Sequence, residues 1–335
     1  MSENQLSHYE VDFKAIVKQI QQVKRNVYQF ANQSLIDLYW NIGKIISQQV
    51  ASSKWGKSIV SELAKFIVKQ DPEIKGFSDK NLWRMKQFYE TYHDNPKLSS
   101  LVREIPWTHN TIIFSRCKSA EEQEFYLQLM IKDKYSSREL ERQIDASLFE
   151  RTITGKQQIS AVLRELHPKI ESNFKDNYVL EFLGLPIQHS EDNLKKSLVQ
   201  NMKNFILELG KDFVFIGEEY RVQVGNSDFF IDLLFFHREL SALVAFELKV
   251  GKFKPEHLGQ LNFYLEALDR DVKKPHEKPS IGVLLCSDKD DEVVEYALSR
   301  HLSPTLISQY TLLLPDKKLL QAKLQEINAM LEVVE

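Results

Sequence analysis

Three ionisable residues interrupt two apolar runs in the second half of the chain. Residues 228–250 read DFFIDLLFFHRELSALVAFELKV, with Asp232 in the first run and Glu247 and Lys249 in the second. Runs this rich in Phe, Ile, Leu and Val are typical of buried strands. A charge in such a place is costly unless an opposite charge or a metal ion compensates it. The residues therefore predict a site rather than a chance cluster.

The numbering predicts how these residues meet. Side chains alternate along a strand, so Glu247 and Lys249 share a face of the second strand, and Asp232 shares a face of the first with Leu234. With a loop centred on 239–240, residues whose numbers add up to 479 lie opposite each other, and Asp232 faces Glu247. Carboxylates whose Cβ atoms are about 4.5–5.5 Å apart repel each other unless a cation lies between them. Oxygen ligands favour Mg²⁺, which needs only one or two carboxylates, and Mn²⁺ is a natural substitute.

The elements that carry these residues follow from periodicity. Apolar residues at three- and four-residue spacing predict helices over 11–50, 57–70, 78–93, 119–133 and 136–149. Ser78 and Ser119 have the spacing of helix starts. Later in the chain, we expect a helix at 191–209, strands at 213–224, 228–237 and 241–250, a helix at 255–269, a strand at 280–286, a helix at 290–300, a strand at 308–314 and a C-terminal helix.

This order predicts a two-domain α+β protein. An all-α N-terminal domain over 1–165 precedes a core over 166–335 with the order α-β-β-β-α-β. The 335 residues are enough for two domains, each with its own core. The net charge of −3 argues against a protein that coats nucleic acid by charge alone, although residues 1–160 carry 23 basic and 19 acidic residues. Two cysteines, Cys117 and Cys286, predict no disulfide framework. The lack of an apolar span favours a cytoplasmic protein without a membrane segment.

At the paired strands the chain resembles a known family. An Asp on one strand, Glu-x-Lys on the next and a helix bearing Gln are the pattern of the PD-(D/E)xK nuclease superfamily, whose restriction-endonuclease-like core has the element order given above. The closer resemblance is to the YhcG-type nucleases. It rests on FFIDLLFF (229–236), FELK (246–249), GKFKPEHLGQLNFYLEALD (251–269) with Gln260, and PSIGVLLC (279–286). YWNIGKII and WGKSIVSELAK resemble the helical N-terminal domain of the same proteins. Ile231 replaces the Pro of the superfamily name, and His257 stands where an aromatic residue is expected.

The resemblance implies a role for each residue. Asp232, Glu247 and the main-chain carbonyl of Leu248 would bind Mg²⁺, and Lys249 would position or deprotonate the attacking water. Gln260 would orient water or phosphate, with Tyr264 one turn further on the same helix face. Many superfamily members add a glutamate from the opening helix. Lys195 and Lys196 lie near its expected position, and Glu208 is taken as the acidic alternative.

The implied activity is Mg²⁺-dependent hydrolysis of DNA phosphodiester bonds, in recombination, repair or defence. Two alternatives remain open: a non-catalytic DNA-binding or assembly module that keeps the fold, and a helical interaction scaffold. No phosphate-binding glycine loop supports ATP or NAD dependence. Lysines and arginines that are candidates for DNA contact, or else simply solvated, are Lys252, Lys254, Lys54, Lys57, Arg84 and Lys86. The sequence leaves the oligomeric state open, including a homo-oligomer.

Overall fold

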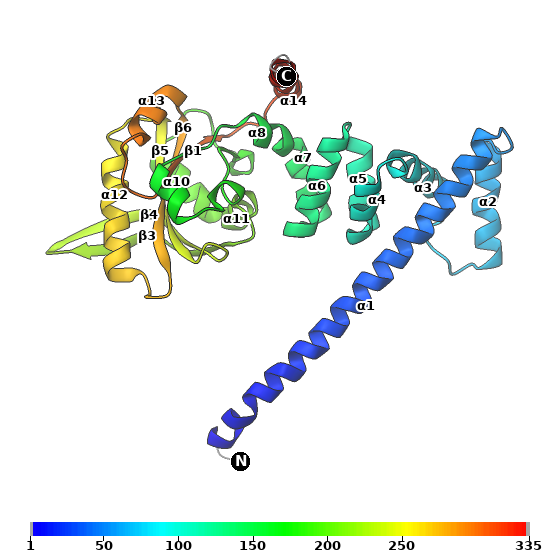
Figure 1. The fold of residues 1–335 in the computed structure, drawn as a ribbon, viewed down its shortest axis with the longest axis horizontal. Helices are drawn as coiled ribbons and strands as arrows, with labels where there is room; N and C mark the ends of the chain where they lie inside the picture. The colour runs from blue at the N-terminus through cyan, green and yellow to red at the C-terminus, as the bar shows by residue number, and fades with distance from the viewer. Residues whose placement is uncertain (1–2, 333–335) are drawn as a thin grey trace. The chain divides into compact units, whose positions relative to one another are not determined.

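The computed structural model describes residues 3–332, and the side chains of residues 13–325. The chain divides into two compact units (Figure 1), a helical unit, Met1–Glu141, and a sheet unit, Arg142–Glu335. The expected order, an all-α part followed by an α/β core, is confirmed. The division lies earlier than the expected 165/166 boundary. Strand β1 (Gln158–Ile159) pairs antiparallel with β7 (Thr305–Thr311), and this pairing joins the segment before residue 166 to the sheet unit.

Helices form the first unit. They are α1 (Glu3–Ala51), α2 (Lys57–Gln70), α3 (Asp79–Tyr92), α4 (Pro96–Leu101), the 3-10 turn η1 (Val102–Glu104), α5 (Trp107–Arg116) and α6 (Ala120–Asp133), while α7 (Ser137–Asp145) crosses the division. The Oγ atoms of Ser78 and Ser119 accept hydrogen bonds from the main-chain N–H groups of Asn81 and Glu122. Both predicted helix starts are therefore confirmed.

Helices α1 and α3 pack closely because Gly43 has no side chain. A Cβ atom at Gly43 would lie 2.1 Å from the main-chain oxygen of Met85 on α3. Around this crossing, Tyr39, Ile46 and Leu82 are buried together. The C-terminal half of α1 therefore lies in the core of the helical unit.

The sheet unit is built on a mixed sheet with the strand order β1-β7-β6-β5-β4-β3, and β2 pairs with β7. Its strands are β1, β2 (Asn177–Val179), β3 (Phe213–Val224), β4 (Ser227–His237), β5 (Ala242–Lys252), β6 (Lys278–Asp288) and β7. Its helices and turns are α8 (Leu148–Thr154), α9 (Ala161–Leu166), η2 (Ile170–Ser172), η3 (Glu181–Leu183), α10 (Glu191–Gln200), α11 (Met202–Leu209), α12 (His257–Ala267), η4 (Leu268–Val272), α13 (Asp291–Leu298) and α14 (Lys317–Glu332).

Helices cover both faces of this sheet (Figure 1). On one face, α10 and α11 contribute Leu194 and Phe205 to a core with Phe246 of β5. On the other face, α12 contributes Leu261 to a second core with Ala245 of β5. Strand β5 is thus buried on both faces, as its almost continuous apolar run predicts. Within residues 3–332, no helix has both the length and the apolar character needed to cross a membrane.

The predicted register of β4 and β5 is confirmed. Leu233 pairs with Phe246 and His237 with Ala242, and both pairs add up to 479. The predicted face alternation along β4 is wrong at Asp232, because Ile231 packs in the same core as Leu234. Asp232 has no partner among the residue pairs between β4 and β3. Glu219 of β3, which would lie opposite it, has a left-handed φ of 43°. The irregular alternation therefore coincides with a gap in the β3–β4 pairing at Asp232.

Candidate active site

Asp232 lies where β4 and β5 separate. The pairs between these strands run from His237 and Ala242 to Leu233 and Phe246. At the next position the Oδ2 atom of Asp232 accepts a hydrogen bond of 2.9 Å from the main-chain N–H of Leu248. The carboxylate thus takes the place of a strand partner and connects β4 with the segment of β5 that carries Glu247 and Lys249.

Glu247 is the buried carboxyl group of the site, with a side chain 2% exposed. Its Oε1 atom lies 2.9 Å from the Nζ atom of Lys249, so the two share a face as predicted. Within the described residues, its Oε2 atom accepts no hydrogen bond. Burial, and next the negative charge of Asp232, raise the pKa of Glu247 to about 7, against the opposing effect of Lys249. Asp232 and Glu247 are therefore close enough to repel each other.

Lys249 is held as a cation. Burial alone would lower its pKa, but its hydrogen bond to Glu247 and the charges of Glu247, Glu191 and Asp232 raise that pKa above the usual value. The Nζ atom of Lys249 also lies 3.5 Å from Glu191. In this arrangement the ammonium group of Lys249 lies against the carboxylates of Glu247 and Glu191.

Helix α10 brings two further charges, Glu191 and Lys195. Glu191 lies in the first turn, where Ser190 caps the helix, and its Oε1 atom accepts a 3.3 Å hydrogen bond from the main-chain N–H of Val250. The Nζ atom of Lys195 lies 2.8 Å from Glu219 and 3.5 Å from Asp232. Sequence reasoning placed the start of this helix correctly but did not select Glu191. The ligand was expected near Lys195 and Lys196, one turn further along this helix.

Glu208, the acidic residue considered for that role, is committed elsewhere. It lies on α11, is fully buried, and its carboxylate is 2.5 Å from Arg142, 3.4 Å from Arg151 and 3.4 Å from Lys175. Burial would raise its pKa, but these three cations and a main-chain N–H lower it to about 2. The structure thus corrects this expectation: Glu208 is the centre of an ion cluster that joins α7, α8 and α11.

Helix α12 carries the polar residues His257, Gln260 and Tyr264. Tyr264 is buried, and its hydroxyl accepts a 2.7 Å hydrogen bond from the Nε2 atom of Gln260. Burial raises the pKa of Tyr264, to which the charges of Glu247 and Asp232 also contribute. His257 accepts a hydrogen bond from the main-chain N–H of Lys254, and burial and Lys249 lower its pKa. The predicted pairing of Gln260 with Tyr264 on one helix face is confirmed.

The basic residues considered for nucleic-acid contact lie in both units. In the sheet unit, Lys252 and Lys254 lie at the end of β5 and in the connection to α12, where they pair with Asp290 and Glu256. In the helical unit, Lys86 pairs with Glu90 and lies over the ring of Trp83. The remaining three, Lys54, Lys57 and Arg84, are exposed.

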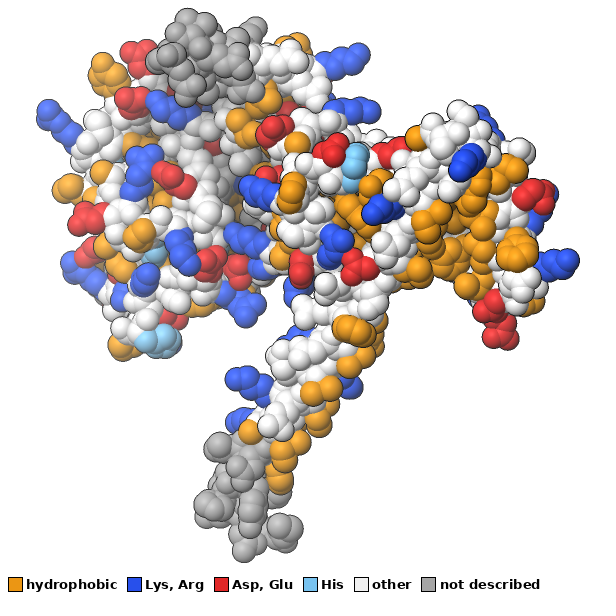
Figure 2. All heavy atoms as spheres, turned by 45° about the vertical axis from the view of Figure 1, so that its right-hand side comes forward, with side chains coloured by type: hydrophobic (Ala, Val, Ile, Leu, Met, Phe, Trp, Pro, Cys, Tyr) orange, Lys and Arg blue, Asp and Glu red, His pale blue; other side chains and the backbone are white. Residues whose placement is uncertain are grey.

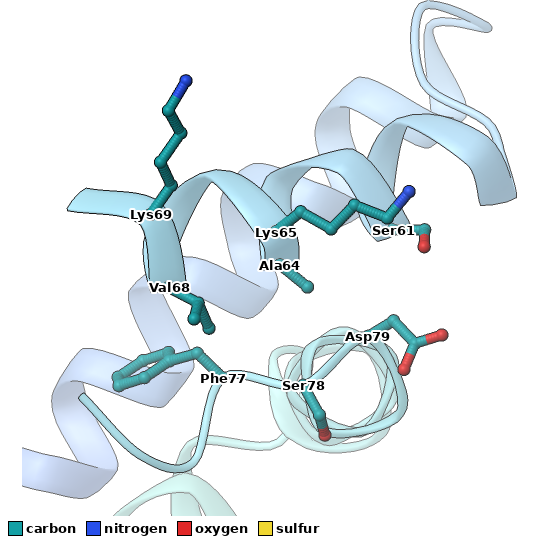
Figure 3. Close-up of a pocket in the computed structure, with 8 residues that line it drawn as sticks. All are labelled: Ser61, Ala64, Lys65, Val68, Lys69, Phe77, Ser78 and Asp79. Atoms are coloured by element: carbon teal, nitrogen blue, oxygen red, sulfur yellow. The ribbon is translucent and has the colours of Figure 1, made fainter. Parts of the chain in front are cut away.

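The helical unit contains a pocket of about 550 Å³ between α2 and the start of α3 (Figure 3). Ala64, Val68 and Phe77 supply apolar surface, and the close-up shows the amino group of Lys69 pointing away from the pocket. Its only carboxylate is Asp79, whose Oδ1 atom accepts a hydrogen bond from the N–H of Lys80. Two acids and a lysine meet where β4 and β5 separate and not here, so that constellation remains the candidate active site.

The metal-binding capacity of the candidate site rests on few side chains. Among the side chains that the structure describes, no group of three or more His, Cys, Asp and Glu residues is arranged to hold an ion. Asp232 and Glu247 are two neighbouring carboxylates, and the buried Glu247 has one oxygen without a hydrogen-bond donor among the described residues. This donor set fits a hard ion such as Mg²⁺, which takes one or two carboxylates and completes its shell with water and phosphate oxygen.

A paired carboxylate site with an adjacent lysine, on a mixed sheet covered by helices on both faces, is typical of a PD-(D/E)xK nuclease domain. Residues 171–325 match the model of the YhcG PDDEXK nuclease domain, and residues 15–151 match that of the DUF1016 N-terminal domain. The chain is 30% identical to the Escherichia coli (strain K12) protein named "Putative nuclease YhcG", over 99% of this chain and 98% of that protein. The chain therefore belongs to the YhcG family of nuclease-domain proteins.

Two solved structures are similar to part of the chain. A repair endonuclease from Pyrococcus abyssi is 18% identical, with a TM-score of 0.27, over 38% of this chain and 49% of that one. The apo form of EndoMS is 16% identical, with a TM-score of 0.24, over 39% of this chain and 48% of that one. Each likeness thus spans about half of the solved chain. The sheet unit, through its match to the PDDEXK nuclease domain, resembles restriction-endonuclease-like folds, as expected from the order of its elements.

Proposed function

We propose that this protein is a divalent-metal-dependent nuclease that hydrolyses phosphodiester bonds in DNA. The observation that carries the proposal is the buried Glu247 carboxyl, which has one oxygen without a donor, next to Asp232 and Lys249. A carboxylate kept near a second carboxylate in an apolar sheet is unfavourable unless a cation joins them. In a protein with a nuclease domain, we infer that this cation is the metal ion that contacts the phosphate to be cleaved.

Mg²⁺ is the proposed ion, and Mn²⁺ would substitute for it. Asp232, Glu247 and the carbonyl oxygen of Leu248 would hold it, and Glu191 is a further carboxylate within reach of Lys249. When bound, such an ion lowers the pKa of water and stabilises charge on the transferring phosphate. The protein contributes oxygen ligands on a rigid strand pair, where Asp232 is fixed by the N–H of Leu248.

The other residues of the site would handle the water and the phosphate. Lys249 is protonated in the arrangement described, so we assign it the positioning of water or a phosphate oxygen through its ammonium group. Gln260, held by Tyr264, would orient the same groups through its amide. Lys195 places positive charge beside Asp232, which limits repulsion between the acids and an approaching phosphate.

The helical unit is proposed to recruit DNA or a partner protein. Its exposed basic residues Lys54, Lys57 and Arg84 offer contacts to the phosphate backbone, as do Lys252 and Lys254 in the sheet unit. Through its family, the protein is proposed to act in DNA recombination, repair or defence within the cytoplasm.

Cleavage assays with purified protein test this function. Linear, nicked, branched and single-stranded DNA are incubated with Mg²⁺, Mn²⁺ or EDTA, and products are resolved on gels. We expect cleavage that EDTA abolishes and that Asp232→Asn or Lys249→Ala reduces by roughly 100-fold or more. Asp228→Asn is the matched control, because Asp228 lies on the same strand but pairs with Arg221. DNA binding without cleavage, unchanged in the variants, would instead indicate a non-catalytic module.

A further inference from the structure

Helix α1 carries an apolar stripe on its N-terminal half. The stripe consists of Ile16, Ile20, Val23, Val27 and Phe30, and each of these side chains is between 51% and 73% exposed. Figure 2 shows hydrophobic side chains in a row along one edge of this helix. Further along α1, Ile36, Tyr39 and Ile46 are buried in the helical unit. The same helix thus changes from a core element to one with an uncovered apolar edge.

The spacing of the stripe is that of a coiled coil. Its members follow one another by four, three, four and three residues, so they occupy alternating a and d positions of a heptad repeat. A helix that packs on a globular surface usually presents a wider apolar face, with a third apolar position in each heptad. On α1 the added positions are mostly polar, because Gln19, Lys24 and Asn26 flank the stripe and only Val17 and the small Ala31 widen it.

We propose that the stripe is the contact surface for a second copy of this chain, through which α1 helices associate as a coiled coil. A coiled coil of identical helices needs flanking positions without like-charge repulsion. Lys24 is the single charged residue among those flanks, and Gln19 and Asn26 are neutral. Covering five such side chains on each of two helices removes on the order of 1,000 Å² from water, the size at which specific interfaces begin.

This surface is independent of the candidate active site. Residues 16–30 belong to the helical unit, whereas Asp232 and Glu247 belong to the sheet unit. Self-association is therefore measurable without any nuclease activity, and its failure would leave the proposed function untouched. If both proposals hold, the coiled coil links two or more nuclease domains in one particle.

Light scattering coupled to gel filtration, and sedimentation velocity, test the proposal on the full-length protein. We expect a mass of at least two copies, with dissociation on dilution. The double variant Ile20→Lys, Val27→Lys should be a monomer. Its circular dichroism should show that the remaining helices are still folded. Gln21→Lys with Gln29→Lys is the matched control, because it adds the same charges to the exposed polar side of the same segment and should keep the assembly. A wild-type monomer at all concentrations overturns the proposal, as does an unchanged assembly in the stripe variant.

A second measurement does not depend on disrupting the helix. Val23 lies at the middle of the stripe, so in parallel helices it lies opposite its counterpart. Val23→Cys should form an intermolecular disulfide under mild oxidation, and Gln21→Cys should not. The native Cys117 and Cys286 are buried and do not interfere. Equal cross-linking of both variants would overturn the proposed contact.

Discussion

Glu247 occupies a position where its protonation and metal binding compete. The side chain is almost fully buried, Lys249 satisfies one oxygen, and the other oxygen has no donor among the described residues. Burial and Asp232 raise its pKa to about 7, so near neutral pH this carboxyl group holds a proton for part of the time. A cation at the second oxygen would displace that proton, because both stabilise the same charge.

We predict that metal-free protein loses stability as pH rises through 7. The Glu247 pKa is higher in the folded than in the unfolded protein, so its contribution is complete below about pH 4.5 and is lost as pH rises through about 7. This contribution is on the order of 3 kcal/mol. Urea unfolding of the wild type and of Glu247→Gln at pH 5.5 and 8 tests this prediction. The quantity to compare is the fall in unfolding free energy between the two pH values in each protein. The variant should show the smaller loss.

Added Mg²⁺ should reverse this pH trend. Because the proton and the ion compete for Glu247, the ion should stabilise the wild-type protein more at pH 8 than at pH 5.5. Glu247→Gln should abolish most of that difference. Equal stabilisation of both proteins at both pH values would show that the ion binds elsewhere.

The sequence predicted the residues of the site better than their full surroundings. Asp232, Glu247 and Lys249 were identifiable because charges in apolar strands need a partner, and the alternation of strands fixed which of them meet. Glu191 lies 41 residues before Asp232 and approaches β5 only through packing of α10 on the sheet. Periodicity carries no information on that packing, so Glu208, on the following helix, was an equally good expectation from the sequence.

Among the elements, α1 and α3 cross closely at Gly43 in the helical unit. A methyl group there would meet the main-chain oxygen of Met85 at 2.1 Å, a distance that only a shift of one helix relieves. We predict that Gly43→Ala destabilises the helical unit by about 2 kcal/mol or more, as overpacking against rigid neighbours does. Thermal unfolding followed by circular dichroism measures the loss.

Gly259→Ala is the comparison for this prediction. Gly259 lies on α12, and a Cβ atom there has no neighbour within 4 Å. The same substitution should therefore stabilise the protein by about 0.5–1 kcal/mol, because alanine favours a helix over glycine. Destabilisation of similar size at both glycines would mean that the crossing of α1 and α3 is not the cause.

The ion cluster around Glu208 is predicted to hold α7, α8 and α11 together. Replacing Glu208 with Gln leaves Arg142, Arg151 and Lys175 without their common counter-charge, so the unfolding free energy should fall by about 3–5 kcal/mol. Because the Glu208 pKa is lowered to about 2, the wild-type contribution is present above about pH 4.5 and is lost as pH falls towards 2. Urea unfolding between pH 3 and 7 tests both effects.

Glu171→Gln provides the matched control for Glu208→Gln. Glu171 pairs with Arg164 at the surface, with 62% of its side chain exposed. An exposed pair of this kind contributes about 0–1 kcal/mol. A comparable loss in both variants would indicate that the buried cluster has no special role.

Element order and register were predictable, and the irregularities were not. The strand pair followed from two apolar runs and a short loop. Its register, in which the numbers of paired residues add up to 479, followed from the position of that loop. The irregularity at Asp232 lies opposite Glu219, which adopts a left-handed conformation that its residue type does not favour. Strand β1 was not predicted because two residues carry too little periodicity, and its pairing with β7 is established only in the folded sheet.

At the scale of the whole molecule, each unit has a core of its own. Tyr39, Val60 and Met85 are buried in the helical unit, whereas Phe246 and Leu261 are buried in the sheet unit. The candidate metal ligands Asp232 and Glu247 both belong to the sheet unit. A ligand stabilises only the part of a protein that must be folded to bind it.

We therefore predict two separable unfolding transitions that respond to different changes. Mg²⁺ at about 100 times its dissociation constant should stabilise one transition by about 2.7 kcal/mol, and Glu208→Gln should lower that same transition. Gly43→Ala should lower the other transition and leave the response to Mg²⁺ unchanged, because Gly43 lies in the helical unit. Differential scanning calorimetry of the wild type and both variants, with Mg²⁺ or EDTA, separates these responses. A single transition that all three changes shift together would contradict the independence of the units, and a Mg²⁺ effect on the Gly43-sensitive transition would place the ion in the helical unit.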